Sequence, residues 1–137
     1  MWKHRFSAAA ALLLIAACAP PPLDGVSNAL AACQRGAQHD EIRDSGTVVR
    51  VLGYGGSHEG FLLMIPLAAG NGSDRVLRAF RVEDNTDITG PIPLHAGERI
   101  AFQGQFECSD DAIHWTHRDP AGRHIDGYIE ADGKTYR

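Results

Sequence analysis

Short runs of alternating apolar and polar residues fill the chain from position 47 to its end, separated by glycine, aspartate and proline. Such alternation with a period of two is typical of β-strands that bury one face. The clearest case places four residues on one face of a strand, namely Ile100, Phe102, Gly104 and Phe106. The predicted strands are Thr47–Leu52, Phe61–Leu67, Val76–Val82, Leu94–Phe106 after an initial turn, Ile113–His117 and His124–Glu130.

Glycine and proline mark the predicted turns. Gly53–Gly56 is expected to be a mobile turn, and Gly70–Ser73 is expected to close a hairpin. Glu83–Pro93 is predicted to be a loop. Asp119–Gly122 has proline second and glycine fourth, which suits a type I turn, and Asp132–Gly133 predicts a hairpin turn near the C-terminus.

One short helix is expected before the strands, over Ser27–Arg35. Its alanines and leucine favour a helix, Ser27 or Asn28 can cap it, and Gly36 can end it. The polar segment Gln38–Gly46 that follows is predicted to be a loop.

This order of elements predicts a mainly β fold without internal repeats. A small OB-like antiparallel β-barrel of five strands accommodates it, because short curled strands interrupted by glycine can close on themselves. The alternative is an open antiparallel sheet with the helix packed against it.

The N-terminus has the features of an export signal. A short basic start is followed by the apolar run Phe6–Ala17, which is too short for a stable transmembrane helix. Cys18 at the cleavage point resembles the lipobox cysteine of bacterial lipoproteins, which carries a diacylglyceryl group and, on the freed amine, a further acyl chain such as palmitate. The alternative is an ordinary signal peptide in which the cysteine has no role.

Processing at Cys18 would divide the chain into three parts. Residues 1–17 are the removed signal peptide, 18–26 are the lipidated cysteine with a proline-rich tether, and 27–137 are one domain. Because Lys3 and Arg5 are removed, the formal net charge changes from −4 to −6. This acidic balance disfavours nucleic acid as a partner.

Two cysteines remain after Cys18, namely Cys33 and Cys108. In an exported chain a disulfide between them is expected, and two free thiols are the alternative. Neither cysteine has the sequence context of a metal ligand or a nucleophile.

Histidines and aspartates gather near the C-terminus. A hairpin around Arg118–Arg123 would bring His117 and His124 together, with Asp119 and Asp126 in reach. His117, His124 and Asp119 are candidate ligands of a divalent metal, and a histidine oriented by aspartate is a candidate general base. The alternative is that these residues fix the hairpin through hydrogen bonds.

Two neighbours of this cluster have less direct roles. His114 and His117 are three positions apart on a predicted strand and are expected to face opposite ways. Trp115 is expected to fill the core.

The stretch Ile113–Pro120, with its continuation to Tyr136, carries a specific pattern around His114–His117, and further matching pieces lie at Ser45–Leu52, Ser57–His58 and Gly97–Gly104. These segments resemble the DUF3465 family. The resemblance implies a small exported bacterial protein of uncharacterised function, known by a His-Trp-Thr-His motif. With the histidine cluster, it singles out a set of candidate functional residues: His58, His114, Trp115, Thr116, His117, Asp119, Arg123, His124 and Asp126.

The chain also departs from the family pattern. Asp84–Asp87 stands where a His-Asn-x-Asp segment is expected, so a site that uses the first histidine would be altered here. Cys33 and Cys108 stand where apolar or aromatic residues are expected, which fits an added disulfide.

The sequence therefore leads to three functional hypotheses. The first is a lipid-anchored binding or envelope-associated module that faces the periplasm, with the histidine hairpin as its functional edge. The second is a metal-dependent, phosphodiesterase-like hydrolase with His114 or His58 as the base, and the third is an inhibitor or immunity lipoprotein that binds a protein toxin. Because Ala19 rather than aspartate follows Cys18, the outer membrane is the expected location.

Overall fold

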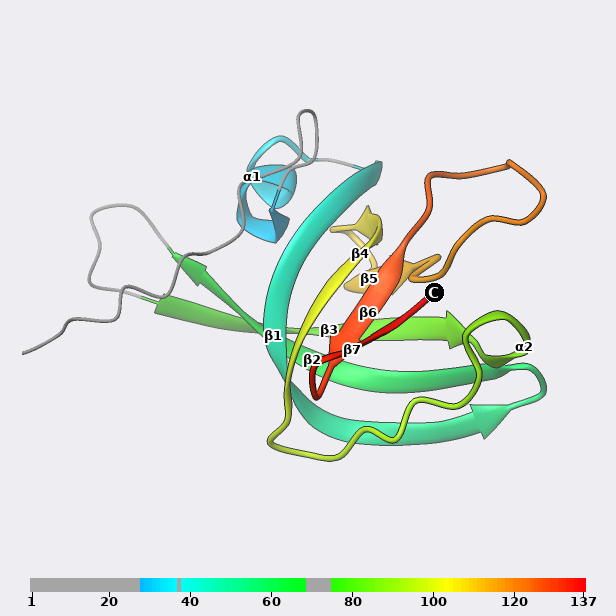
Figure 1. Ribbon diagram of the computed structural model, residues 1–137. Helices are drawn as coiled ribbons and strands as arrows, with labels where there is room; N and C mark the ends of the chain where they lie inside the picture. The colour runs from blue at the N-terminus through cyan, green and yellow to red at the C-terminus, as the bar shows by residue number, and fades with distance from the viewer. Residues whose placement is uncertain (1–27, 37, 69–74) are drawn as a thin grey trace, which may run out of the picture.

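The computed structural model describes residues 28–36, 38–68 and 75–137 (Figure 1). The predicted signal peptide and tether and the Gly70–Ser73 turn lie outside these residues. The elements are α1 (Ala29–Gln34), β1 (Gln38–Gly55), β2 (His58–Ala68), β3 (Arg75–Asn85), α2 (Thr86–Thr89), β4 (Arg99–Glu107), β5 (Ala112–His114), β6 (Tyr128–Ala131) and β7 (Lys134–Tyr136). Neither helix of this described part is long and apolar enough to cross a membrane.

Five strands close into a ring, because β1 pairs with two partners. The sheet order is β1-β2-β3-β5-β4-β6-β7, and an additional β1–β4 pairing closes the first five strands. The first half of β1 pairs with β4 and the second half with β2, so Thr47 faces Arg99 on one side and Met64 on the other. Figure 1 shows β1 bending between these two partners. The predicted mainly β fold is confirmed, while the OB-like barrel remains a prediction.

Gly46 lies at this bend and has to be glycine. A Cβ at this position would lie 2.6 Å from the Met64 carbonyl oxygen. The absence of a side chain therefore lets β1 pass closely over β2.

The interior of the ring holds the core. The predicted inward face of β4 is confirmed, since Ile100, Phe102 and Phe106 are buried. The other strands add large side chains that are completely or almost completely buried: Ile42, Val48, Phe61, Leu63, Ile65, Phe80, Val82, Ile113 and Ile129.

Three predicted loops before β4 are wrong in whole or in part. Gln38–Gly46 is the first half of β1, because its backbone pairs with β4 and Ile42 enters the core. Strand β1 also continues through Gly53 to Gly55, so the turn to β2 is shorter than expected. Glu83–Pro93 begins as the end of β3 and contains α2, which Asn85 caps by accepting the Asp87 N–H.

The predicted C-terminal strands are too long. Strand β5 ends at His114 and β6 starts only at Tyr128, and both pair with β4 rather than with each other. The predicted histidine hairpin is therefore a loop over residues 115–127. The two turns are confirmed: the Gly122 N–H donates to the Asp119 carbonyl, and β6 and β7 form a hairpin around Asp132–Gly133.

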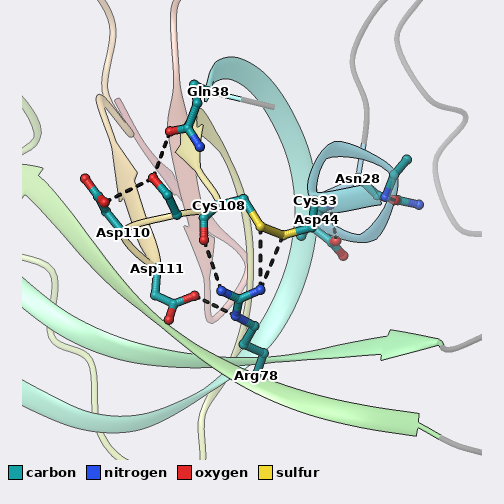
Figure 2. Close-up of a disulfide and its surroundings, with 11 residues drawn as sticks. Asn28, Cys33, Gln38, Asp44, Arg78, Cys108, Asp110 and Asp111 are labelled. Carbon is teal, nitrogen blue, oxygen red and sulfur yellow. Dashed lines mark hydrogen bonds and ion pairs between the residues drawn. A yellow bond between two sulfur atoms is a disulfide. The ribbon is translucent and has the colours of Figure 1, made fainter. Parts of the chain in front are cut away.

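Helix α1 is held against the ring by a disulfide and by burial. The Cys33–Cys108 disulfide is present, as predicted, and Ala29 and Ala32 are completely buried. The helix spans Ala29–Gln34 and is slightly shorter than the predicted Ser27–Arg35, because Asn28 is its N-cap. Ser27 lies outside the described residues. Figure 2 shows the Arg78 guanidinium directed at the disulfide; it contacts both sulfurs, donates to the Cys108 carbonyl and pairs with Asp111.

Candidate functional site

Three separate segments surround a cavity of about 290 Å³. His58 is the first residue of β2, Asn85 and Ile88 come from the end of β3 and from α2, and the other residues come from the 115–127 loop. We call this cavity the histidine pocket; its lining is His58, Asn85, Ile88, Trp115, His117, Asp119, Pro120, Arg123 and His124. The structure thus brings His58 to the C-terminal loop, which the sequence could not show.

Sheet register explains how His58 reaches this position. In the β2–β3 pair, His58 lies opposite Asn85, at the end of both strands. The short helix α2 follows Asn85 directly and adds Ile88. Asn85 and Ile88 are lining residues that the sequence reasoning missed, although their neighbour Asp84 was noted as a departure from the family pattern.

Each of the two loop histidines is oriented by the backbone carbonyl of the residue that follows it. His117 Nδ1 lies 2.7 Å from the Arg118 carbonyl oxygen, and His124 Nδ1 lies 2.8 Å from the Ile125 carbonyl oxygen. Because a carbonyl oxygen only accepts hydrogen bonds, each Nδ1 must carry the proton and donate it. In the neutral ring, Nε2 is then left as an acceptor.

The two rings also contact each other. Their centroids are 5.2 Å apart in an edge-to-face arrangement. The predicted proximity of His117 and His124 is therefore correct, but it arises from a folded loop and not from strand pairing.

Trp115 is not a core residue, contrary to prediction. Its side chain is 39% exposed and its ring lies 4.2 Å, centroid to centroid, from the ring of His124. Its φ is +58°, a conformation that bulky residues rarely adopt. Strand β5 ends at the preceding residue, and this backbone turn directs the indole to the pocket wall. Local strain of this kind gathers at functional sites.

Glycine allows the loop to lie tightly against the sheet. A Cβ on Gly127 would lie 2.1 Å from the Trp115 carbonyl oxygen and 2.7 Å from that of Gln103. The Gly127 N–H donates to the His117 carbonyl, and the Gln103 side chain donates to the Asp126 carbonyl. These contacts fix both ends of the loop.

The Asp119 carboxylate organises the loop between these ends. It accepts the backbone N–H groups of Ala121, Arg123 and His124. Desolvation raises the pKa of Asp119, but the backbone donors of His124 and Ala121, with the charges of His124 and Arg123, outweigh it and hold the pKa below its usual value. Asp126 has a similar role, since its Oδ1 accepts the Asp119 N–H at 2.7 Å.

Thr116 does not line the pocket but attaches the 115–127 loop to the end of β3. It is completely buried and donates from Oγ1 to Asp84 Oδ1. Thr89 donates to the other oxygen of Asp84. Burial raises the pKa of Asp84, and the bonds from Thr89 and Thr116, with the charge of His117, offset part of the shift.

His114 lies apart from the pocket. It is on β5 opposite Gln105, and its Nδ1 lies 3.4 Å from Glu83 Oε2. Within the ranges that the structure describes, no group of three or more histidine, cysteine, aspartate or glutamate side chains is arranged to hold a metal ion.

A larger cavity of about 740 Å³ lies between the 92–99 loop and the β6–β7 hairpin. Two of its charged groups have local partners: the Lys134 ammonium lies over the Tyr136 ring, and Arg99 donates to Ser45. We place the candidate site in the smaller pocket, because three imidazoles and a conformationally strained tryptophan line it.

The ring of strands and this pocket define a small, mainly β protein with a histidine-lined site at one end of its sheet. A family model described as a protein of unknown function, DUF3465, matches residues 13–137, so the chain belongs to the DUF3465 family. No curated protein and no solved structure matches the chain. The function therefore has to be argued from the pocket.

Proposed function

We propose that the protein is a lipid-anchored, periplasm-facing binding module that holds a small ligand in the histidine pocket. The observation that carries this proposal is the backbone of Trp115, whose positive φ directs a partly exposed indole to the pocket wall. A folded chain tolerates such strain and exposure where they serve a site.

The chemistry of the lining favours binding over hydrolysis. The Asp119 carboxylate, a candidate metal ligand, accepts three backbone N–H groups and is thereby committed to the loop. The imidazoles, in contrast, keep an Nε2 acceptor for a ligand. Polar groups held in a fixed orientation beside an aromatic wall are typical of ligand pockets.

A fragment screen by NMR tests the binding site. We expect the fragments that bind to shift the Trp115 indole and the His117 and His124 imidazole signals. A His117→Ala variant should lose these hits, while His95→Ala, in an exposed position away from the pocket, should keep them. Hits confined to the larger cavity beside Tyr136 would reject the proposal.

The lipid anchor is a separate part of the proposal. It is supported by the basic start, the apolar run Phe6–Ala17 and the cysteine at position 18. Growth with an alkyne-labelled palmitate should label the wild-type chain and place it in the outer-membrane fraction. A Cys18→Ala chain should not be labelled; equal labelling of both chains would show that Cys18 is not the modified residue.

A further inference from the structure

We infer that the histidine pocket takes an uncharged ring that carries several hydroxyl groups, such as a single sugar unit. This inference rests on the proposed binding function and adds the chemical class of the ligand. It follows from the hydrogen-bonding groups that the loop leaves for a ligand, from the aromatic wall and from the size of the cavity.

His117 and His124 give the pocket hydrogen-bond acceptors. Each uses its Nδ1–H on a backbone carbonyl, so in the neutral form of either ring the Nε2 lone pair is the group left for a ligand. The His124 Nε2 lies 4.0 Å from Asp119 Oδ1, which is beyond hydrogen-bond distance. A lone pair binds a donor such as a hydroxyl, whereas an ionised carboxylate or phosphate presents only further lone pairs to it.

The pocket also offers hydrogen-bond donors. Arg123 carries a guanidinium, which can only donate. Asn85 uses its Oδ1 on the Asp87 N–H, so its amide NH₂ group is the part left to donate. The pocket thus combines donors with acceptors, and a hydroxyl group matches both because it donates one hydrogen bond and accepts others.

The apolar wall and the size of the pocket suit a single ring. The Trp115 ring is supported on the His124 ring, and Ile88 and Pro120 add further apolar surface to the lining. An amphipathic ring can pack a C–H face on the indole while its hydroxyls reach the polar groups. A cavity of about 290 Å³ lies at the small end of ligand pockets, which suits one ring rather than a chain of rings.

Titration of the processed chain with defined probes tests this inference. Trp2 lies in the predicted signal peptide, so Trp115 is the sole tryptophan of the processed chain and its fluorescence reports on the pocket. The neutral probes are glucose, galactose, N-acetylglucosamine and myo-inositol; the comparison probes are cyclohexanol, phenyl phosphate and zinc chloride. We expect at least one neutral polyol to bind with millimolar affinity, and cyclohexanol to bind at least about tenfold more weakly.

Variants separate the contributions. Calorimetry measures the affinity for the polyol, and Trp115→Leu and His117→Leu should each lower it about tenfold or more. His117→Gln should lower it less than His117→Leu, because glutamine keeps an acceptor. His95→Gln should leave the affinity unchanged. Binding of phenyl phosphate or zinc without any polyol would overturn the inference but leave the binding function intact. If no probe binds and the fragment screen gives no hits, both the polyol inference and the proposed binding function are rejected.

Discussion

Thr116 donates a hydrogen bond to Asp84 at 2.9 Å, although the two residues are 32 positions apart and both are completely buried. This bond ties the 115–127 loop to the end of β3. The same strand end supplies Asn85 and leads into α2, so the bond holds two walls of the histidine pocket together.

Replacing Thr116 by valine should therefore destabilise the protein. Valine keeps the shape but removes the donor, which leaves a buried carboxylate oxygen of Asp84 with one bond fewer. We expect the free energy of unfolding to fall by about 1–3 kcal/mol, measured by urea denaturation. The exposed Thr135→Val is the control, and equal stability of the two variants would show that the Thr116 bond contributes nothing.

A methyl group on Gly127 should displace the loop. The added Cβ of Gly127→Ala would overlap the Trp115 carbonyl, so the backbone has to shift, at a cost of about 1–3 kcal/mol. Trp115 fluorescence should change together with the unfolding midpoint. Gly55→Ala is the matched control, because no atom of the described residues lies within 4 Å of its added Cβ. An unchanged spectrum in Gly127→Ala would contradict the tight fit.

The sequence predicted the strands whose inward faces are apolar, and β4 is the best example. The first half of β1 was missed, because among its inward positions only Ile42 is a large apolar residue, with Asp44 and Gly46 beside it. Its strand conformation depends on pairing with β4, about 60 residues away in sequence, and a local pattern does not contain that information.

The candidate site was predicted in composition but not in geometry. His117 and His124 do lie together, yet the reason is a loop fixed by Asp119 and Gly127. The position of His58 follows from the β2–β3 register, and the exposure of Trp115 follows from a positive φ. Both are consequences of tertiary structure, so spacing along the chain could not reveal them.

The Asp119 carboxylate should control the order of the loop. In Asp119→Ala the backbone N–H groups of Ala121, Arg123 and His124 lose their acceptor, so their hydrogen exchange should become faster. Because the pKa of Asp119 is held below its usual 3.8, its stabilising contribution is present above that pH and is lost as the pH falls through the lower native value. Asp110→Ala, at an exposed position, should leave these three amides unchanged; the same exchange rates in both variants would reject this role.

Reduction of the disulfide should loosen α1. Cys33 and Cys108 are 75 positions apart, and closing a loop of this length constrains the unfolded chain by about 4 kcal/mol. A reductant should therefore lower the unfolding free energy by about that amount. The Cys33→Ala, Cys108→Ala double variant should have the reduced stability with or without reductant, and a wild-type protein that is insensitive to reduction would contradict the prediction.

Glu41 should make stability depend on pH near neutrality. Burial raises the pKa of its carboxyl from 4.5 to about 7, and a side-chain hydrogen bond with Gln103 lowers it only in part. Its Oε1 is buried and has no hydrogen-bond partner among the described residues. The folded protein thus keeps a proton that the unfolded chain releases between pH 4.5 and about 7, so stability falls as the pH rises through this window.

A neutral isostere removes this dependence. Relative to Glu41→Gln, the wild-type protein should lose about 1 kcal/mol of unfolding free energy between pH 5 and pH 8, a discounted value because the carboxyl is only partly buried. Urea denaturation at both pH values measures the difference, and subtracting the variant cancels the titration of the histidines. Glu130→Gln, on the exposed side of β6, should follow the wild-type profile. Parallel profiles for the wild type and Glu41→Gln would show that Glu41 does not titrate in this range.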